Sequence, residues 1–298
     1  MNIKIVVRRV IPFILLCNFN IFTACRQERQ LRPDHARIAG GVEMRDVRFY
    51  SEALGRQMPY RVFLPTNLQP GEKLFTVYLL HGAYNDFRSW SNFSDVSQFA
   101  RDGFLLVMPE GGASSYFMNA VEAPKDKFED YVTRDLIADV EARFPVRRGR
   151  DSRAVIGISM GGLAAVDYAL AHPDLFRFVG ALSPSIDAPS RRFSWKRTGQ
   201  WWRFRRVFGP VGSSERRARD PFVMIQSADP KTTPFIYLTA GRQEALMGPI
   251  RRFAASLKKR NFDYEFRVMQ GGHDWNQWNA QIPGCFASLR EHVVNKIR

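Results

Sequence analysis

Residues 154–162 read Ala-Val-Ile-Gly-Ile-Ser-Met-Gly-Gly, an apolar run followed by a serine between two glycines. The run 154–156 predicts a buried strand, and the residues after Gly161 predict a helix. Gly157 and Gly161 permit a turn so tight that larger residues would clash, and such a turn exposes the Ser159 hydroxyl at the end of the strand. Gly-x-Ser-x-Gly alone also occurs in ordinary glycine-rich turns, so the surrounding strand and helix carry the prediction of a nucleophile elbow.

A nucleophilic serine needs a base to accept its proton and an acid to orient that base. In hydrolases with such an elbow they follow in the chain order serine, acid, histidine. Of the five histidines, His273 is the best placed, because it follows the alternating apolar segment 262–268 and lies in the glycine-containing loop 271–275. The other histidines precede Ser159 or lie in helix-like segments. We therefore predict His273 as the base.

Glu244 is the predicted acid, because it follows the apolar segment 235–240, the strand expected before the His273 loop. Asp274 is the chief rival, but it directly follows His273, and adjacent residues of a loop rarely place a carboxylate against a ring nitrogen. Asp229 is a weaker alternative in a segment interpreted as a loop before the strand. Glu244 also fits a second interpretation, as a solvated carboxylate at the start of the next helix.

Acyl transfer also needs two backbone amides directed at the oxyanion that develops in the transition state. The amide of Met160, directly after the nucleophile, is one expected donor. The second is expected in the turn after an earlier strand, where Gly82 lets the backbone approach the substrate closely. We predict the amide of Ala83 for this role, or that of Tyr84 if the turn is one residue longer. His81 is interpreted as a structural residue that supports this loop.

Further segments carry a family resemblance. They are Tyr-Arg-Val-Phe-Leu-Pro at 60–65, Leu-Leu-His-Gly at 79–82, Val-Met-Pro-Glu-Gly-Gly at 107–112, Ile-Ser-Met-Gly-Gly at 158–162, His-Pro-Asp-Leu-Phe at 172–176 and Gly-His-Asp-Trp at 272–275. With these motifs the chain resembles the esterase-D-like esterase family of α/β-hydrolases, from about residue 47 to the C-terminus. That family includes feruloyl and acetyl-xylan esterases, S-formylglutathione hydrolases and mycolyltransferases.

The resemblance implies an α/β-hydrolase fold, with a mostly parallel central sheet flanked by helices. It places the family's nucleophile, acid and base on Ser159, Glu244 and His273, in agreement with the argument from chain order. Family members often have aspartate where Glu244 stands, and the glutamate adds one methylene of reach. No cluster of metal ligands is visible among the three cysteines and five histidines, and we predict no cofactor.

One domain is predicted over residues 46–298, because no linker or repeat divides the chain. Short apolar runs suit strands buried on both faces, and helical periodicity lies between them. The runs are 104–108, 154–158, 178–182 and 235–238. Phe286, Leu289, Val293 and Ile297 predict a last helix that covers the edge of the sheet, and Cys285 beside it is interpreted as a buried, inert thiol.

Residues 1–25 predict an export signal, because basic residues precede the apolar stretch 10–22. That stretch is too short to span a bilayer comfortably, which takes roughly 20 residues. Phe-Thr-Ala-Cys at 22–25 resembles a bacterial lipobox with phenylalanine in place of the usual leucine, so Cys25 is a candidate for lipidation and membrane tethering. Ordinary cleavage near Ala24 is the alternative. Residues 26–45 would form a polar tether, and the expected location is periplasmic, envelope-anchored or secreted.

Residues 185–220 form a predicted cap segment rich in arginine and aromatic residues, inserted between two strands. In one interpretation, indoles stack on a sugar or phenolic ring while guanidinium groups hold a carboxylate or phosphate. In the other, which we favour, the aromatics pack the cap onto the domain and the arginines form a solvated face. The residues predicted to contact substrate are Tyr84, Trp201, Trp202 and Trp275.

The formal net charge of +15 raises nucleic acid as a partner, but no recognition motif accompanies it, and we predict no specific nucleic-acid binding. Anionic envelope surfaces are the expected target of this charge, and no oligomeric state is predicted. The predicted function is a serine esterase that acts on small or aromatic acyl esters of sugars or alcohols, with short acyl chains expected. One alternative is an acyltransferase that passes the acyl group to a sugar hydroxyl. Another is a non-catalytic protein that uses the aromatic cap to bind a glycan.

Overall fold

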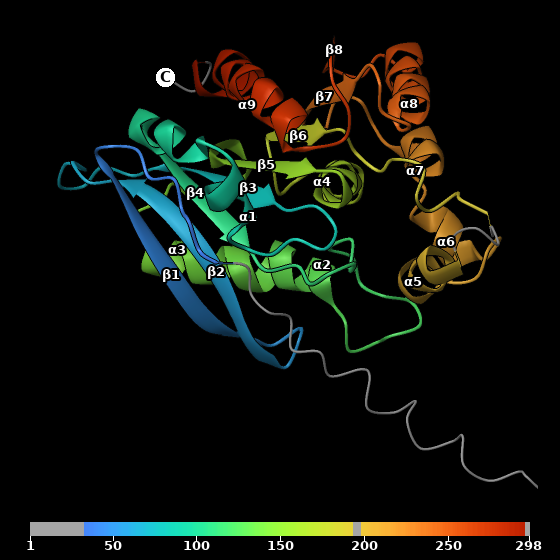
Figure 1. Cartoon of the computed structure of the whole chain (residues 1–298), viewed down its shortest axis with the longest axis horizontal. Coiled ribbons are helices and arrows are strands. Elements are labelled where there is room, and N and C mark those ends of the chain that lie inside the picture. Colours follow the sequence, from blue (N-terminus) through green and yellow to red (C-terminus); the bar gives the residue numbers. More distant parts are fainter. Residues whose placement is uncertain (1–32, 193–197, 296–298) are drawn as a thin grey trace, which may run out of the picture. The chain divides into compact units, whose positions relative to one another are not determined.

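The four apolar runs predicted from the sequence become β4, β5, β6 and β7 of one sheet, whose order is β1-β2-β4-β3-β5-β6-β7-β8 (Figure 1). Strand β1 pairs antiparallel with β2, and β2 with β4, whereas every other pairing is parallel. The strands are β1 (Val42–Ser51), β2 (Arg56–Pro65), β3 (Phe75–Leu80), β4 (Phe104–Pro109), β5 (Arg153–Ile158), β6 (Phe178–Leu182), β7 (Phe235–Gly241) and β8 (Tyr264–Met269). This sheet confirms the predicted mostly parallel architecture.

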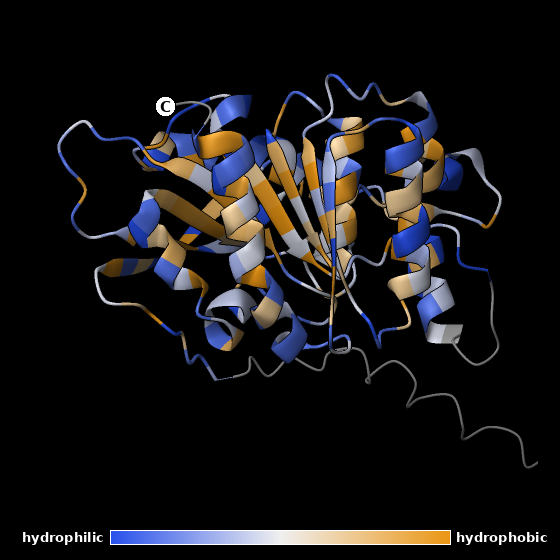
Figure 2. Cartoon of the chain, turned by 90° about the horizontal axis from the view of Figure 1, so that it is seen from above, coloured by the Kyte–Doolittle hydropathy of each residue, from blue (hydrophilic) through white to orange (hydrophobic). Residues whose placement is uncertain are grey.

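Helices cover both faces of the sheet and enclose one hydrophobic cluster on each. On one face lie α1 (Ser89–Phe93), the 3-10 helix η1 (Val96–Asp102) and α9 (Trp275–Leu289). On the other lie α2 (Phe128–Asp130), the π-helical η2 (Tyr131–Leu136), α3 (Ile137–Arg143), α4 (Met160–Ala171) and α8 (Met247–Lys259). Figure 2 shows largely hydrophobic strands between helices in which hydrophilic and hydrophobic residues alternate. Burial on both faces explains why strands β3 to β7 read as largely continuous apolar runs, whereas the edge strand β8 alternates.

The segment between β6 and β7 contains the predicted cap. Its described residues form the helices α5 (Thr198–Phe208), α6 (Ser214–Ala218) and α7 (Pro221–Ser227). Helix α7 lies beyond the predicted cap boundary and contacts α4 and α8. Short elements also occur elsewhere in the described chain, namely η3 (Arg150–Ser152) before β5 and the π-helical η5 (Arg290–Val294) after α9.

The last helix differs from the prediction in its position. It begins at Trp275, directly after the His273 loop, and it lies over β6 and β7 rather than at the sheet edge formed by β8. Packing explains this placement, because Phe286 stacks on Phe99 of η1 with ring centroids 4.0 Å apart. A side chain at Gly180 of β6 would meet Cys285 Sγ at 2.6 Å. Cys285 is buried, as predicted.

The computed structural model describes residues 33–192 and 198–295. The predicted export signal with Cys25, and the first part of the predicted tether, lie outside the described residues. Strand β1 begins at Val42, before the predicted domain start at residue 46, because it pairs with β2 along its whole length. The Arg37 amide also donates to the Ser91 carbonyl at 2.8 Å. Within the described ranges no helix is long and apolar enough to cross a membrane.

Candidate active site

Ser159 lies on the sharp turn between β5 and α4. Its backbone has φ +52° and ψ −108°, a left-handed conformation that is uncommon for a residue with a side chain. A β-carbon at Gly157 would lie 2.1 Å from the Gly161 carbonyl oxygen, and one at Gly161 would lie 2.4 Å from the Leu80 carbonyl oxygen. Both positions therefore accept only glycine, which is the physical reason for the Gly-x-Ser-x-Gly pattern.

The three residues predicted for nucleophile, base and acid lie in one line of hydrogen bonds. Ser159 Oγ is 2.8 Å from His273 Nε2, and His273 Nδ1 is 2.9 Å from Glu244 Oε2. The Glu244 side chain is fully buried, whereas that of His273 is 35% exposed. Glu244 is therefore not a solvated carboxylate at a helix start. The three side chains follow β5, β7 and β8, whose carboxyl ends meet at one edge of the parallel sheet.

The two rival acids have other roles. Asp274 accepts a hydrogen bond from the Gln277 amide at 3.1 Å and thereby caps the N-terminus of α9. Asp229 accepts from the Lys231 amide at 3.0 Å in the loop before β7, at the opposite end of that strand from Glu244. Among the described residues, Glu244 is the carboxylate that contacts His273.

Two backbone amides near Ser159 have no acceptor among the described residues and are candidates to bind an oxyanion. Met160 is the first residue of α4, so its amide has no acceptor within the helix. The Tyr84 amide donates to the Ala113 carbonyl at 2.8 Å and is already occupied. The Ala83 amide has no acceptor in the described part of the chain, and the adjacent Gly82 lies next to the nucleophile, since a β-carbon there would sit 3.6 Å from Ser159 Cβ. The geometry therefore favours Ala83 over Tyr84.

His81 is buried and holds two loops together at this edge of the sheet. Its Nδ1 lies 2.8 Å from the Gly82 carbonyl oxygen, and its Nε2 accepts a hydrogen bond from the Gly111 amide at 2.9 Å. Because Nε2 accepts, the proton belongs on Nδ1. This arrangement agrees with a structural role for His81 in supporting the turn that contains Ala83.

The four aromatic residues predicted to contact substrate differ in their surroundings. Tyr84 is 57% exposed and Trp202 is 63% exposed, so both offer free ring surface. Trp201 meets Trp202 edge to face, with ring centroids 4.7 Å apart. Trp275 is half-buried and packs against Trp90, Phe93 and Trp278, at 5.7, 5.5 and 5.3 Å. Its main contacts are thus with the core beneath α1 and α9.

Two residues beside the nucleophile and base were missed by the sequence prediction. Ser185 places its Oγ 3.4 Å from Ser159 Oγ, and its amide donates to the Ser159 carbonyl at 3.0 Å. Trp278 meets the His273 ring edge to face at 5.2 Å. The available signal for Ser185 was its position just after β6, which neighbours β5, because both strand ends reach the same edge of the sheet.

The cap is attached mainly by packing and ion pairs. Phe204, Val207 and Phe208 of α5 are buried on one face of the helix, and Tyr116 contacts both phenylalanines at 5.7 and 5.1 Å. The next arginines of α5 are neutralised, because Arg205 pairs with Glu122 at 2.9 Å and Arg206 pairs with Asp126 at 2.7 Å. The favoured interpretation thus holds for this part of the cap, while residues 193–197 of the predicted cap lie outside the described residues.

A buried ion network joins the end of the cap to the body of the domain. Arg219 pairs with Glu129 of α2 at 2.5 Å and with Asp167 of α4 at 3.2 Å, and His172 Nε2 lies 2.7 Å from Glu129. Burial raises the pKa of Asp167 to about 7. Burial also acts to raise the pKa of Glu129, but hydrogen bonds from His172 and Arg219 outweigh it and lower that pKa to about 2. The hydrogen bond with Glu129 raises the pKa of His172.

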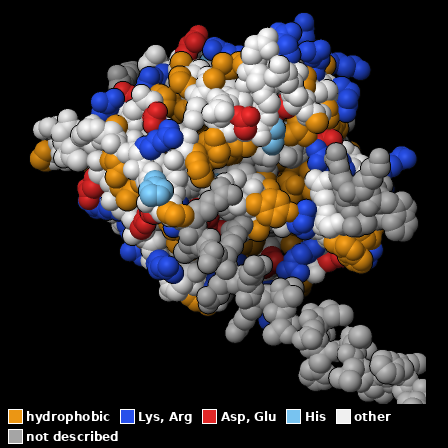
Figure 3. Space-filling view, in the orientation of Figure 1, with side chains coloured by type: hydrophobic (Ala, Val, Ile, Leu, Met, Phe, Trp, Pro, Cys, Tyr) orange, Lys and Arg blue, Asp and Glu red, His pale blue; other side chains and the backbone are white. Residues whose placement is uncertain are grey.

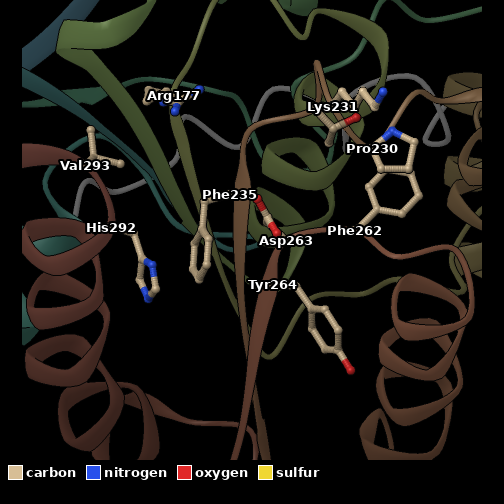
Figure 4. A pocket seen from close by; sticks show the side chains of 10 residues that line it. Arg177, Pro230, Lys231, Phe235, Phe262, Asp263, Tyr264, His292 and Val293 are labelled. Carbon is tan, nitrogen blue, oxygen red and sulfur yellow. The ribbon is translucent and has the colours of Figure 1, made fainter. Parts of the chain in front are cut away.

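Other surface features lie away from Ser159. The pocket in Figure 4 is lined by Phe235 and Tyr264, the first residues of β7 and β8, and thus lies at the amino ends of the strands. His292 stacks on Phe235 there, with ring centroids 3.9 Å apart. Figure 3 shows lysine and arginine side chains gathered over α8. Within residues 33–192 and 198–295, no group of three or more His, Cys, Asp or Glu side chains is arranged to hold a metal ion.

A mostly parallel sheet with a serine elbow and a histidine–carboxylate pair at one edge defines the class of α/β-hydrolases. A family model described as "Putative esterase" matches residues 51–289 of the chain. The match covers most of the sequence, and the chain belongs to this esterase family, as the resemblance of its motifs predicted.

Individual relatives have low sequence identity to the chain but align with most of its length. An acetyl esterase of Caldicellulosiruptor saccharolyticus is 25% identical over 254 residues, which span 80% of this chain and 95% of that protein. The diacylglycerol acyltransferase/mycolyltransferase Ag85A of Mycobacterium leprae is 24% identical over 250 residues, spanning 73% and 75%. The solved structure of FphF, a fluorophosphonate-binding serine hydrolase of Staphylococcus aureus, has a TM-score of 0.72 at 21% identity and covers 84% of this chain and 99% of its own. That similarity shows the shared fold.

Proposed function

We propose that the chain is a serine esterase that cleaves carboxylic esters through an acyl-enzyme. The observation that carries this proposal is the continuous line from Ser159 Oγ through His273 to the buried Glu244 carboxylate, with both contacts below 3.0 Å. A line of this kind lets a weakly acidic hydroxyl act as a nucleophile, because the proton has an acceptor and the acceptor has a fixed orientation.

In the proposed reaction Ser159 Oγ attacks the ester carbonyl while its proton passes to His273 Nε2. The Glu244 carboxylate stabilises the resulting imidazolium through Nδ1, and the amides of Met160 and Ala83 bind the carbonyl oxygen as it becomes negative. His273 then gives the proton to the departing alcohol, which leaves an acyl group on Ser159. Water repeats these steps on the acyl-enzyme and releases the acid, so no cofactor is required.

Small or aromatic acyl esters of sugars or alcohols are the proposed substrates, with short acyl chains favoured. The similarity to an acetyl esterase supports a small acyl group. The exposed rings of Tyr84 and Trp202 support an aromatic or sugar portion, because such rings present apolar surface for stacking.

Rates with p-nitrophenyl acetate, butyrate and octanoate, and with acetylated and feruloylated sugars, test this proposal. The wild type should turn over at least one short-chain ester. Ser159→Ala should lose on the order of 1,000-fold or more in kcat and keep its fold. Equal rates for the two proteins would refute esterase chemistry at Ser159.

Acyl transfer to a sugar hydroxyl is a second candidate, supported by the similarity to a mycolyltransferase. Hydrolysis and transfer share the acyl-enzyme and differ in the acceptor, so product analysis separates them. With trehalose or an oligosaccharide present, transfer yields a new ester, whereas hydrolysis yields only free acid.

We also propose that the protein is exported and that Cys25 receives lipid. The support is the order of basic, apolar and Phe-Thr-Ala-Cys segments in residues 1–25. Incorporation of labelled palmitate into the wild type, and its loss in Cys25→Ala, tests lipidation. Export without label in either protein would favour ordinary cleavage near Ala24.

A further inference from the structure

The turn that carries Ala83 brings Tyr84 against a cationic side chain of the cap. The Arg203 guanidinium carbon lies 5.2 Å from the centroid of the Tyr84 ring, within the range of a cation–π contact. Tyr84 adopts φ +60°, a left-handed conformation that costs free energy for a non-glycine residue and persists where the surroundings impose it. The hydrogen bond that the Tyr84 amide donates to the Ala113 carbonyl helps to impose this conformation here. The exposed Tyr84 ring thus follows Ala83 directly in the chain, and the half-buried Arg203 lies against that ring.

The backbone at Arg203 is held by the packing of α5. Phe204 and Phe208 anchor the helix on Tyr116, and the Val207 carbonyl accepts a hydrogen bond from the Val121 amide at 3.0 Å. Arg216, which is buried, donates to carbonyls of three other cap residues and ties the cap together: Pro189 at 2.6 Å, Gly209 at 3.0 Å and Arg191 at 2.8 Å. A helix held in this way sets the point at which the Arg203 side chain leaves the backbone, so that point does not depend on the flexibility of a loop.

Arg203 differs from Arg191, Arg205 and Arg206, because among the described residues no carboxylate neutralises its charge. Arg191 pairs with Asp187 at 2.7 Å, and Arg205 and Arg206 pair with Glu122 and Asp126. No carboxylate of the described residues pairs with Arg203, and the cap sequence 193–197 contains no acidic residue. Residues 185–220 contain ten basic and three acidic residues, which makes the surroundings attractive to anions.

We propose that Arg203, stacked on Tyr84, recognises a carboxylate or another anionic group on the ester substrate, at a distance from the scissile bond. This inference rests on the proposed esterase function and adds a substrate class to it. Arg203 would be a specificity residue and would take no part in the chemistry at Ser159. The planar guanidinium can stack on the ring through one face and still donate hydrogen bonds from its edge, which suits carboxylate binding.

Matched pairs of esters test the proposal. Mono-p-nitrophenyl esters of dicarboxylic acids, from succinate to suberate, carry the charge on the acyl half, and their methyl esters are neutral counterparts. 4-Acetoxybenzoate and its methyl ester place the charge on the alcohol half instead. For at least one pair the wild type should prefer the anion by roughly five- to tenfold in kcat/KM, the size expected for a charge-assisted hydrogen bond at a partly exposed site. The preference should shrink as salt is added.

Variants then identify the residue responsible. Arg203→Gln should remove the preference for the anion and leave kcat/KM for the neutral esters within about twofold of the wild type. Arg205→Gln is the matched control, because Arg205 is already paired with Glu122, and it should keep the preference. Absence of a preference in the wild type, or an equal effect of Arg203→Gln on charged and neutral esters, would overturn the inference while the esterase activity stands. A wild type that hydrolyses none of these esters would instead overturn the proposed function.

Discussion

One oxygen of the Glu244 carboxylate faces His273 Nδ1 at 2.9 Å, and its other oxygen accepts the Gly241 amide at 2.8 Å. The second contact prevents the carboxylate from rotating away, so the imidazole is held with Nε2 directed at Ser159. Because the Glu244 side chain is fully buried, solvent and salt screen its charge only weakly. Glu244 and Gly241 together set the orientation of the base.

Glu244→Gln should therefore reduce kcat for ester hydrolysis by about 1,000- to 10,000-fold, because an amide no longer selects the tautomer with a proton on Nδ1. Asp274→Asn is the matched control, since Asp274 adjoins His273 but caps α9. It should keep kcat within about threefold and lose no more than about 1 kcal/mol of unfolding free energy. Steady-state kinetics and urea unfolding of both variants measure these effects. A large loss of kcat in Asp274→Asn with normal activity in Glu244→Gln would reverse the assignment.

The elbow makes a prediction about stability. Gly161→Ala places a β-carbon 2.4 Å from the Leu80 carbonyl oxygen. That oxygen belongs to the backbone of β3, which cannot move away without disturbing the sheet. We expect a loss of about 3 kcal/mol or more, or failure to fold, measured by urea unfolding. Gly82→Ala is the comparison, because its β-carbon would meet its nearest neighbour at 3.5 Å, an ordinary contact. It should fold with nearly wild-type stability but lose activity, since it narrows the space beside Ser159. Similar free energies of unfolding for the two variants would show that the turn at Gly161 has room for a β-carbon.

The ion network of the cap predicts a pH dependence of stability. The pKa of Asp167 is raised to about 7 in the folded protein, above its value of 3.8 in an unfolded chain. The folded state therefore holds the extra proton, and this contribution to stability is full below pH 3.8 and is lost as pH rises through about 7. The pKa of Glu129 is lowered to about 2, so its contribution changes only in acid.

Asp167→Asn removes the titrating group and should flatten the profile. Between roughly pH 5 and pH 8 the wild type should lose more unfolding free energy than the variant, by an amount on the order of a few kcal/mol. Urea unfolding at both pH values measures the difference. The raised pKa of His172 gives it a stabilising charge that is also lost as pH rises. His172→Gln removes this contribution alone and therefore serves as the control that separates it from the contribution of Asp167. Parallel profiles for the wild type and Asp167→Asn would contradict the raised pKa.

The features of the site that depend on strand order and local backbone geometry were predictable from the sequence. Gly157 and Gly161 are required by contacts of the elbow itself, and the pattern of strands brings Ser159, Glu244 and His273 to the same edge of the sheet without knowledge of helix packing. The fold class and the family were predictable for the same reason, because short motifs at strand ends define them.

Contacts that depend on the packing of helices were not predictable from one sequence. Arg219 meets Asp167, which is 52 positions away, only because the cap returns to the side of α4. The last helix was predicted at the edge of the sheet, but Phe286 stacks on Phe99 of η1, and the helix therefore lies over one face of the sheet. Ser185 was assigned to the cap, although its side chain stands beside Ser159. Periodicity indicates that a helix has an apolar face but does not say which surface it meets.

Covalent labelling by a fluorophosphonate probe tests whether Ser159 is an activated nucleophile. Such a probe reacts with a serine whose proton is withdrawn by a neighbouring base, so the wild type should be labelled on the peptide that contains Ser159, as read by mass spectrometry. Ser159→Ala should take up no label, and His273→Ala should be labelled far more slowly while remaining folded. A folded wild type that stays unlabelled, or a Ser159→Ala protein that is labelled equally, would contradict the assignment of Ser159, His273 and Glu244 to catalysis.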